Sequence, residues 1–272
     1  MMIGIRAHDL VSGNIKEVLT QAEEYGFDTI QLVFKKALKQ DFNEENALIV
    51  KEELKHHNIK IAILGAYFNP VHSNEELVKK NIEYFKEHLR LASLLDCKYV
   101  GTETGSYNDD KWTYNPKNQT EEGYQQTMKV FHELVEVAKQ CKTTILMEPA
   151  WGHVIFDVDQ LKRAFDEINS EYFKVTIDLY NLMNLHKKDF RNYKETFVKA
   201  LSTFKDDVKV IHLKDFYLEG EGIKQCGLGK GIIDFKFIVE TAKQYCPNAT
   251  LVFEGVVGDD IISSKKLIDS YN

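Results

Sequence analysis

Four side chains suited to chemistry each end an apolar run in the second half of the chain. Glu148 ends TILME, Asp178 ends VTID, His212 ends VKVIH and Glu254 ends LVFE. Successive members lie 30, 34 and 42 positions apart, and each interval is close to one strand plus one helix. Because parallel strands in such units present their carboxyl ends at one edge, we expect the four side chains to meet there.

The alternation of side chains along these runs adds a second argument. Successive side chains of a strand point to opposite faces, so the first Glu, the His and the last Glu share a face with Leu146, Val210 and Val252, respectively. Three carboxylates in one partly dehydrated site at the end of a barrel repel one another, and a bound divalent cation relieves that repulsion. An oxygen-rich set with one imidazole suits Mn²⁺, Mg²⁺, Co²⁺ or Zn²⁺. The sequence therefore predicts that one divalent metal ion binds these four residues.

Short β-rich runs alternate with helical patterns along the whole chain. The runs cover residues 3–8, 29–34, 60–67, 99–103, 144–148, 174–178, 208–213 and 250–254. The helical patterns cover residues 14–25, 43–57, 75–95, 121–139, 158–168, 190–201, 234–244 and 260–271. Such alternation indicates a parallel sheet, and eight units favour a closed barrel over an open doubly wound sheet. The predicted fold is α/β, a single (β/α)8 TIM barrel in one domain over residues 1–272.

Two connections are longer than the others and follow the fourth and seventh predicted strands. They cover residues 105–120 and 214–233. Both lie on the side of the barrel where active sites are built, so we expect them to cover a substrate.

Composition limits the classes of function. The chain has 35 Lys and Arg residues against 42 Asp and Glu residues, a net charge of −7, which disfavours nucleic acid as a partner. No apolar run approaches the roughly 20 residues of a membrane helix, so no membrane association is expected. The four cysteines (Cys97, Cys141, Cys226 and Cys246) form no CxxC pair. They are typical of reduced thiols, which favours a cytoplasmic location.

Several short motifs give the sequence a family resemblance. They are Met147-Glu148-Pro149, Ile177-Asp178-Leu179-Tyr180-Asn181, Ile211-His212-Leu213-Lys214-Asp215, the GLGKGIIDF segment at residues 227–235, and Phe253-Glu254-Gly255. With these motifs the chain resembles the xylose-isomerase-like TIM barrel superfamily, specifically the sugar phosphate isomerase/epimerase family. The resemblance spans essentially the whole chain.

The resemblance implies a function and roles for the four strand-end residues. It implies a metal-dependent isomerase or epimerase that acts on a small-molecule sugar or sugar phosphate by proton transfer through an enediolate. Glu148, Asp178, His212 and Glu254 would hold one divalent metal, and the two glutamates would be catalytic, exchanging protons with the substrate from opposite faces. Relatives also imply a homodimer or a homotetramer.

The chain departs from the epimerase pattern at one position. Asn181 stands where these epimerases have a His three residues after the Asp. An Asn can donate a hydrogen bond to a substrate oxygen but cannot act as an acid or base. A metal-dependent dehydratase of the inosose dehydratase type therefore stays open, as does a sugar-binding barrel without catalysis.

Further polar or aromatic residues near predicted strand ends are candidates for substrate binding. Arg6 and His8 share a face of the first predicted strand, although an inward Arg6 could instead pair with a barrel carboxylate such as Glu103. The full set of substrate-binding candidates is Arg6, His8, His72, Glu103, Trp151, His153, Asn181 and Lys214.

Overall fold

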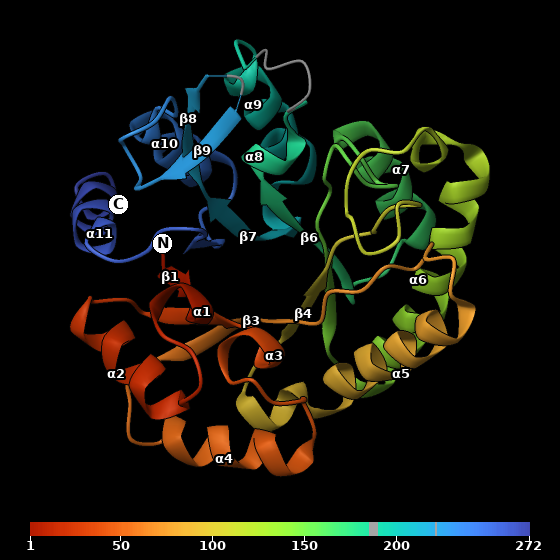
Figure 1. Cartoon of the computed structure of the whole chain (residues 1–272), viewed down its shortest axis with the longest axis horizontal. Helices are drawn as coiled ribbons and strands as arrows, with labels where there is room; N and C mark the ends of the chain where they lie inside the picture. The colour runs from red at the N-terminus through yellow and green to blue at the C-terminus, as the bar shows by residue number, and fades with distance from the viewer. Residues whose placement is uncertain (185–189, 221) are drawn as a thin grey trace.

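Eight parallel strands close into a barrel that helices surround (Figure 1). The computed structural model describes residues 1–184, 190–220 and 222–272. Around the barrel the strands follow the order β1-β10-β7-β6-β5-β4-β3-β2, so neighbours in the chain are neighbours in space. The closed barrel confirms the predicted (β/α)8 fold.

The barrel strands are short and lie close to the predicted positions. They are β1 (Ile3–Arg6), β2 (Thr29–Leu32), β3 (Lys60–Gly65), β4 (Tyr99–Thr102), β5 (Thr144–Met147), β6 (Phe173–Asp178), β7 (Val208–Leu213) and β10 (Thr250–Phe253).

The long helices cover the outside of the barrel. They are α2 (Ile15–Glu24), α4 (Glu44–Leu54), α5 (Glu75–Leu91), α6 (Glu121–Cys141), α7 (Val158–Ile168), α9 (Tyr193–Phe204), α10 (Phe235–Tyr245) and α11 (Asp260–Asp269). Short helices α1 (Ala7–Leu10), α3 (Phe34–Ala37) and α8 (Leu179–Leu182) follow strands β1, β2 and β6. None of the described helices is long and apolar enough to cross a membrane.

Side chains in the sequence fix where several helices begin. Asn14, Asn43, Asn74 and Asp157 each precede a helix, and each accepts a hydrogen bond from a backbone N–H of its first turn. Such caps satisfy N–H groups that have no partner inside the helix. The local sequence thereby sets the residue at which each of these helices begins.

A small apolar cluster fills the barrel beneath the strand ends. It consists of Ile63, Leu146, Val210 and Val252, each at most 1% exposed. The last three are the residues that alternation along the strands placed on the inner face, so that prediction is confirmed. Gly101 makes room for the layer, since a Cβ there would lie 2.4 Å from Ile63 Cδ1.

The first predicted strand is too long. β1 ends at Arg6, and His8 lies in α1, so the prediction that Arg6 and His8 share a strand face was wrong. Asp9 explains the turn: its carboxylate accepts hydrogen bonds from the Arg6 guanidinium at 2.8 and 2.9 Å and from the Gly255 N–H at 2.7 Å. These contacts favour a helical turn over a longer strand.

The connection after β7 is more ordered than predicted. Within residues 214–233 it forms an antiparallel pair, β8 (Asp215–Glu219) and β9 (Gly222–Cys226). The Asp215 side chain explains the rest of this connection, because it accepts hydrogen bonds from the N–H groups of Gly229, Gly231 and Ile233. One buried carboxylate thus anchors the glycine-rich segment.

Candidate active site and metal centre

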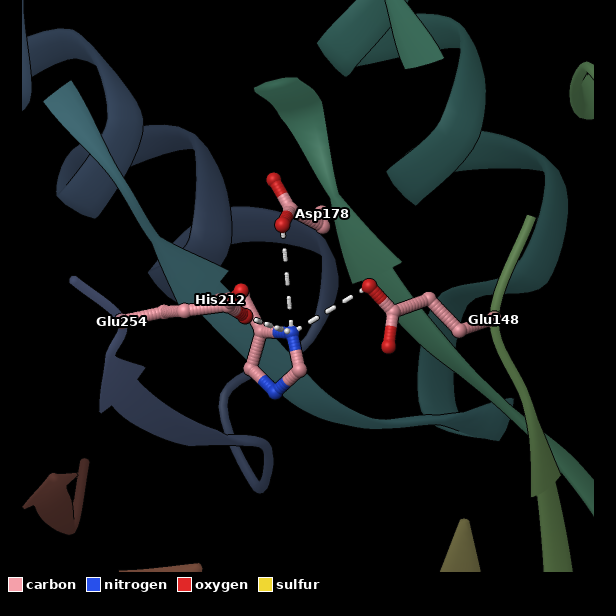
Figure 2. Close-up of side chains that lie close together, drawn as sticks. All are labelled: Glu148, Asp178, His212 and Glu254. Atoms are coloured by element: carbon pink, nitrogen blue, oxygen red, sulfur yellow. Dashed lines mark hydrogen bonds and ion pairs between the residues drawn. The ribbon is translucent and has the colours of Figure 1, made fainter. Parts of the chain in front are cut away.

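Four side chains from four neighbouring strand ends converge at the carboxyl end of the barrel (Figure 2). They are Glu148, Asp178, His212 and Glu254, and one ligand atom from each lies within 4.8 Å of the other three. The first three are nearly inaccessible to solvent, and Glu254 is half-buried. The structure therefore brings together the four predicted metal ligands.

The imidazole of His212 is oriented by contacts at both nitrogens. Its Nδ1 lies 3.0 Å from Glu254 Oε2 and 3.3 Å from Glu148 Oε1, and these carboxylates approach from opposite sides (Figure 2). Its Nε2 lies 2.8 Å from Gln31 Oε1, which can only accept a hydrogen bond, so Nε2 carries a proton. Nδ1 is therefore the nitrogen available to the cluster.

The contact with Gln31 continues to the hydroxyl group of Tyr67. Gln31 Nε2 donates to Tyr67 Oη at 2.8 Å, so the Tyr67 oxygen is an acceptor in this chain of hydrogen bonds. Its own hydrogen is left to point toward another group, and both Gln31 and Tyr67 line the adjoining cavity. The Tyr67 hydroxyl group thus has its hydrogen left to donate to another group at the cavity.

Two cationic side chains also reach the carboxylates. Lys214 Nζ lies 2.9 Å from Asp178 Oδ2 and 2.7 Å from Glu254 Oε1, and Arg6 lies 2.7 Å from the same Glu254 oxygen. Arg6 pairs with Asp9 and Glu254, and not with Glu103. The cluster is therefore a buried network of both signs of charge.

Burial and neighbouring charges act in opposite directions on the protonation of these groups. Burial alone would lower the pKa of His212, but Glu148 and Glu254 outweigh it and raise that pKa to about 10. Burial would raise the pKa of Glu254, yet Lys214, His212 and Arg6 hold it well below its usual value. Desolvation dominates at Asp178 and raises its pKa, although Lys214 opposes this. Ionised groups persist here because they neutralise one another.

The residues present fit a divalent metal ion. The donor set is three carboxylates and one imidazole nitrogen, which suits Mn²⁺, Mg²⁺, Co²⁺ or Zn²⁺. Asp178 Oδ1 accepts hydrogen bonds from two backbone N–H groups, whereas the buried Oδ2 faces the cluster, where the Lys214 ammonium group lies 2.9 Å away. A cation, here that of Lys214, thus already occupies the position beside Oδ2, and Gln31 is the kind of outer partner that orients a metal-binding His.

A cavity of about 330 Å³ opens beside the cluster. Six predicted residues line it: Arg6, His8, Glu103, Glu148, Asn181 and Glu254. Five residues that the sequence analysis did not select also line it: Gln31, Val33, Lys36, Tyr67 and Trp112. Tyr67 ends the predicted strand over residues 60–67, so the same signal could have found it, whereas Gln31 lies within the predicted strand over residues 29–34 and nothing in the sequence distinguishes Lys36 or Trp112.

Asn181 links two carboxylates at the edge of the cluster. Its Nδ2 donates to Glu148 Oε1 at 2.8 Å and to Glu103 Oε1 at 3.2 Å, and its backbone oxygen accepts from the Trp151 N–H. Burial, with Glu148 and Glu254 nearby, raises the pKa of Glu103 well above its usual value. The raised pKa favours the protonated form of Glu103 in the cavity wall.

Aromatic side chains form the wall on the side of residues 105–120. The Trp112 ring, which lines the cavity, packs edge-on against buried His153 at 5.4 Å, and Tyr114 stacks on Trp151 at 5.0 Å. Burial lowers the pKa of His153 to about 4, so its imidazole is neutral. His153 thus supports the cavity wall through its contact with Trp112, and neither His153 nor Trp151 is among the residues that line the cavity.

His72 lies apart from the other candidates. It is not among the residues that line the cavity; its Nδ1 accepts the Asn74 N–H at 2.9 Å, and the ring lies 3.7 Å from Asp109 and 3.5 Å from Asp110. Lys214 does not line the cavity either, but it contacts two of the four cluster carboxylates.

The fold and site together define a barrel of the kind that places a metal centre at the carboxyl ends of its strands. The family model described as xylose isomerase-like TIM barrel matches residues 19–257. The chain therefore belongs to the xylose isomerase-like TIM barrel family, as the sequence motifs indicated.

Solved structures with low sequence identity share the fold. A D-tagatose 3-epimerase-like protein is 20% identical, with a TM-score of 0.78 over 100% of this chain and 97% of that one. The IOLI protein, solved with a zinc atom, is 17% identical, with a TM-score of 0.76 over 100% and 96%. The probable 3-DHS dehydratase AsbF from Bacillus anthracis is 14% identical, with a TM-score of 0.76 over 100% of both chains. No curated protein shows a significant match.

Proposed function

We propose that the chain is a divalent-metal-dependent isomerase or epimerase that moves a proton beside the carbonyl group of a sugar or sugar phosphate. The observation that carries this proposal is the placement of Glu148 and Glu254. Both belong to the ligand cluster, both line the cavity, and they approach His212 Nδ1 from opposite sides (Figure 2). Two opposed carboxylates suit removal of a proton from one face of a carbon and its return to the other.

The metal ion would be held by Glu148, Asp178, His212 and Glu254. When bound, it would act as a Lewis acid that stabilises negative charge on substrate oxygens. A proton on the carbon next to a carbonyl is too weakly acidic to leave unaided at neutral pH, so this charge stabilisation makes an enediolate accessible.

Other residues of the chain would prepare the two glutamates and the substrate. Asn181 fixes Glu148 through a 2.8 Å hydrogen bond, and Lys214, His212 and Arg6 keep Glu254 ionised. Tyr67 would donate a hydrogen bond to a substrate oxygen, because its own oxygen already accepts from Gln31. The Trp112 ring would limit the access of water to the reacting carbon, which protects a proton in transit from exchange.

A dehydratase that uses the same residues is a second candidate, and Glu103 favours it. Loss of water requires a proton for the departing hydroxyl group, and Glu103, which lines the cavity and whose pKa burial raises well above its usual value, would supply one. The similarity to a probable dehydratase fold is compatible with this alternative.

Exchange of substrate protons with heavy water tests both candidates. The chain is loaded separately with Mn²⁺, Mg²⁺, Co²⁺ or Zn²⁺ and incubated with a panel of sugars and sugar phosphates, and mass spectrometry measures deuterium uptake. We expect a product that is an isomer of the substrate, with one hydrogen replaced by deuterium. A product lighter by one water identifies the dehydratase, and saturable sugar binding without exchange identifies a barrel that only binds.

Matched variants connect the exchange to the two glutamates. Glu148→Gln and Glu254→Gln should each lower exchange by at least about 10²-fold while the circular dichroism spectrum stays unchanged. Glu24→Gln, an exposed change on α2, is the control and should exchange normally. Normal exchange by both site variants would overturn the proposed mechanism.

A further inference from the structure

A second cavity lies at the opposite end of the barrel, where the strands begin. We call it the basal cavity; its volume is about 630 Å³, compared with about 330 Å³ at the candidate metal centre. Its walls come from the end of α4, the starts of β3 and β4, and the 3-10 turn at Ala92–Leu95. The candidate metal centre lies at the carboxyl ends of the strands, so the two cavities are separate.

Positive charge surrounds the basal cavity. Lys51, Lys55, Lys60, Lys98 and Lys209 line it. Asp96 is the one acidic side chain among the described lining residues. The chain as a whole has more acidic than basic residues, so this local excess of lysines runs against the overall composition.

Three of these lysines have no charged partner among the residues that the structure describes. Lys55 pairs with Glu52, and Lys209 donates to the backbone oxygen of Asp206. Lys51, Lys60 and Lys98 make no ion pair within the part of the chain that the structure describes. Their ammonium groups are therefore available to an anion from solution.

Apolar side chains form a large part of the wall of the basal cavity, beside the lysines and the polar residues Thr29, Asn248 and Thr250. Leu54, Ile59, Ile61, Leu94 and Tyr99 line it, and the two isoleucines are buried. A cavity of this volume, with an apolar wall and a few charged groups, has the character of a small-molecule site. Inorganic ions would use the lysines alone and leave the apolar wall uncovered.

We propose that the basal cavity binds a small organic anion that carries a carboxylate or phosphate group on an apolar aromatic or acyl body. The anionic group contacts Lys60 and Lys98, which lie at the starts of the neighbouring strands β3 and β4. The body covers the isoleucines and Tyr99. This site is independent of the chemistry proposed at the other end of the barrel.

Calorimetric titration of the full chain with 1-naphthyl phosphate and 1-naphthoate tests the proposal. We expect saturable binding of at least one probe, which also shows whether phosphate or carboxylate is preferred. Inorganic phosphate and 1-naphthol each lack one half of the probe and should bind at least about tenfold more weakly. Absence of binding by both probes, or equal binding of either control compound, overturns the proposal.

Charge-reversal variants locate the binding. Lys60→Glu combined with Lys98→Glu should weaken the preferred probe by at least about tenfold, because two attractions become repulsions. Lys16→Glu combined with Lys80→Glu makes the same change in net charge on exposed helix positions elsewhere and should leave affinity within about twofold. Equal loss in both double variants would show a general charge effect and overturn the proposal.

A third variant separates the two cavities. His8→Ala combined with Lys36→Ala removes two basic groups that line the cavity at the candidate metal centre. Probe affinity should be unchanged in this variant. If the probe bound more weakly here but normally to the variant with Lys60→Glu and Lys98→Glu, the probe would occupy the cavity at the candidate metal centre, and the proposal would be wrong. Failure of this test leaves the proposed proton transfer intact, since that reaction is measured separately.

Discussion

The two ends of the barrel handle charge in opposite ways. At the carboxyl end, three acidic residues, His212 and Lys214 are packed together, and Lys214 is only 8% exposed. At the amino end, lysines surround the basal cavity with one acidic side chain among the described lining residues. Charges at the first end are buried and mutually neutralised, whereas those at the second are solvated and largely unpaired.

This difference shows which charges the fold must stabilise. Removing an ion from water is costly unless partners compensate it, so each buried group at the carboxyl end depends on the others. Lysines at the amino end retain most of their hydration, and no such dependence exists among them. Substitutions should therefore have large, coupled effects at one end and small, additive effects on stability at the other.

The largest effect is expected when a cluster ligand is removed. His212→Ala deletes the single nitrogen donor and should weaken Mn²⁺ binding by more than about 100-fold, beyond the loss typical of an outer-shell change. Isothermal titration calorimetry measures the affinity, and His132→Ala, an exposed change on α6, is the control. An unchanged affinity in His212→Ala would show that the cluster is not the metal site.

Removal of the partner behind His212 should have the next largest effect. Gln31→Leu leaves Nε2 without its acceptor and frees the ring to rotate, so Mn²⁺ affinity should fall by about 10- to 100-fold. Tyr67 lies one hydrogen bond further from His212 than Gln31 does. The variant Tyr67→Phe should therefore keep a Mn²⁺ affinity within about twofold of the wild type. Equal losses in both variants would contradict the order of contacts described above.

His88 sharpens the comparison, because it is buried without compensating charge. Burial lowers its pKa from 6.5 to about 4, whereas the carboxylates around His212 raise the pKa of that residue. Unfolded His88 binds a proton below about pH 6.5 and folded His88 only below about pH 4, so unfolding takes up a proton between these values. Stability should therefore fall as the pH drops through this window and change no further below it.

The measurement is urea denaturation at pH 7 and pH 5. His88→Gln should lose about 2 kcal/mol less than the wild type between these two conditions. The exposed variant His132→Gln should behave as the wild type does. Identical losses in the wild type and His88→Gln would show that burial does not hold His88 neutral.

A substitution of Lys214 tests whether the positive charge already present at the carboxyl end weakens the binding of a metal ion. Its ammonium group already neutralises Asp178 and Glu254, and it would repel a divalent cation placed among them. Lys214→Met should therefore raise Mn²⁺ affinity by about tenfold and lower the thermal stability of the metal-free chain. Weaker metal binding in this variant would show instead that Lys214 organises the ligands.

The smallest effect is expected at the amino end. Lys60→Glu and Lys98→Glu should each change the free energy of unfolding by less than about 0.5 kcal/mol, as is usual for exposed charges. Urea denaturation measures this, with Lys16→Glu as the matched control. A loss several times larger would mean that these lysines are structural and that the contrast between the two ends is weaker than described.

The sequence predicted the barrel and the ligand cluster from local information. Apolar runs of strand length, helical patterns of apolar residues and polar strand ends all act within a few residues of the chain. Alternation along a strand placed Leu146 and Val252 on the same face as the neighbouring glutamates, and the inner apolar layer confirmed it. The β8–β9 pair was missed, because it depends on hydrogen bonds between two strands and on the glycine-rich segment held by Asp215.

The residues that complete the cavity depended on closure of the barrel. Gln31 contacts His212 across 181 positions of sequence, and Trp112 reaches the cavity from a long connection. No local pattern identifies such partners, since the barrel must close before either residue has a neighbour there.

Spacing and periodicity thus determined the fold class and the convergence of the four strand-end side chains, because secondary structure and side-chain direction follow from short-range backbone geometry. Only the tertiary structure decided which nitrogen of His212 faces the carboxylates, which cations hold them ionised, and how the lysines of separate strands surround one basal cavity. The physical reason is that pKa values and hydrogen-bond direction depend on burial and on neighbours brought together by the closed sheet.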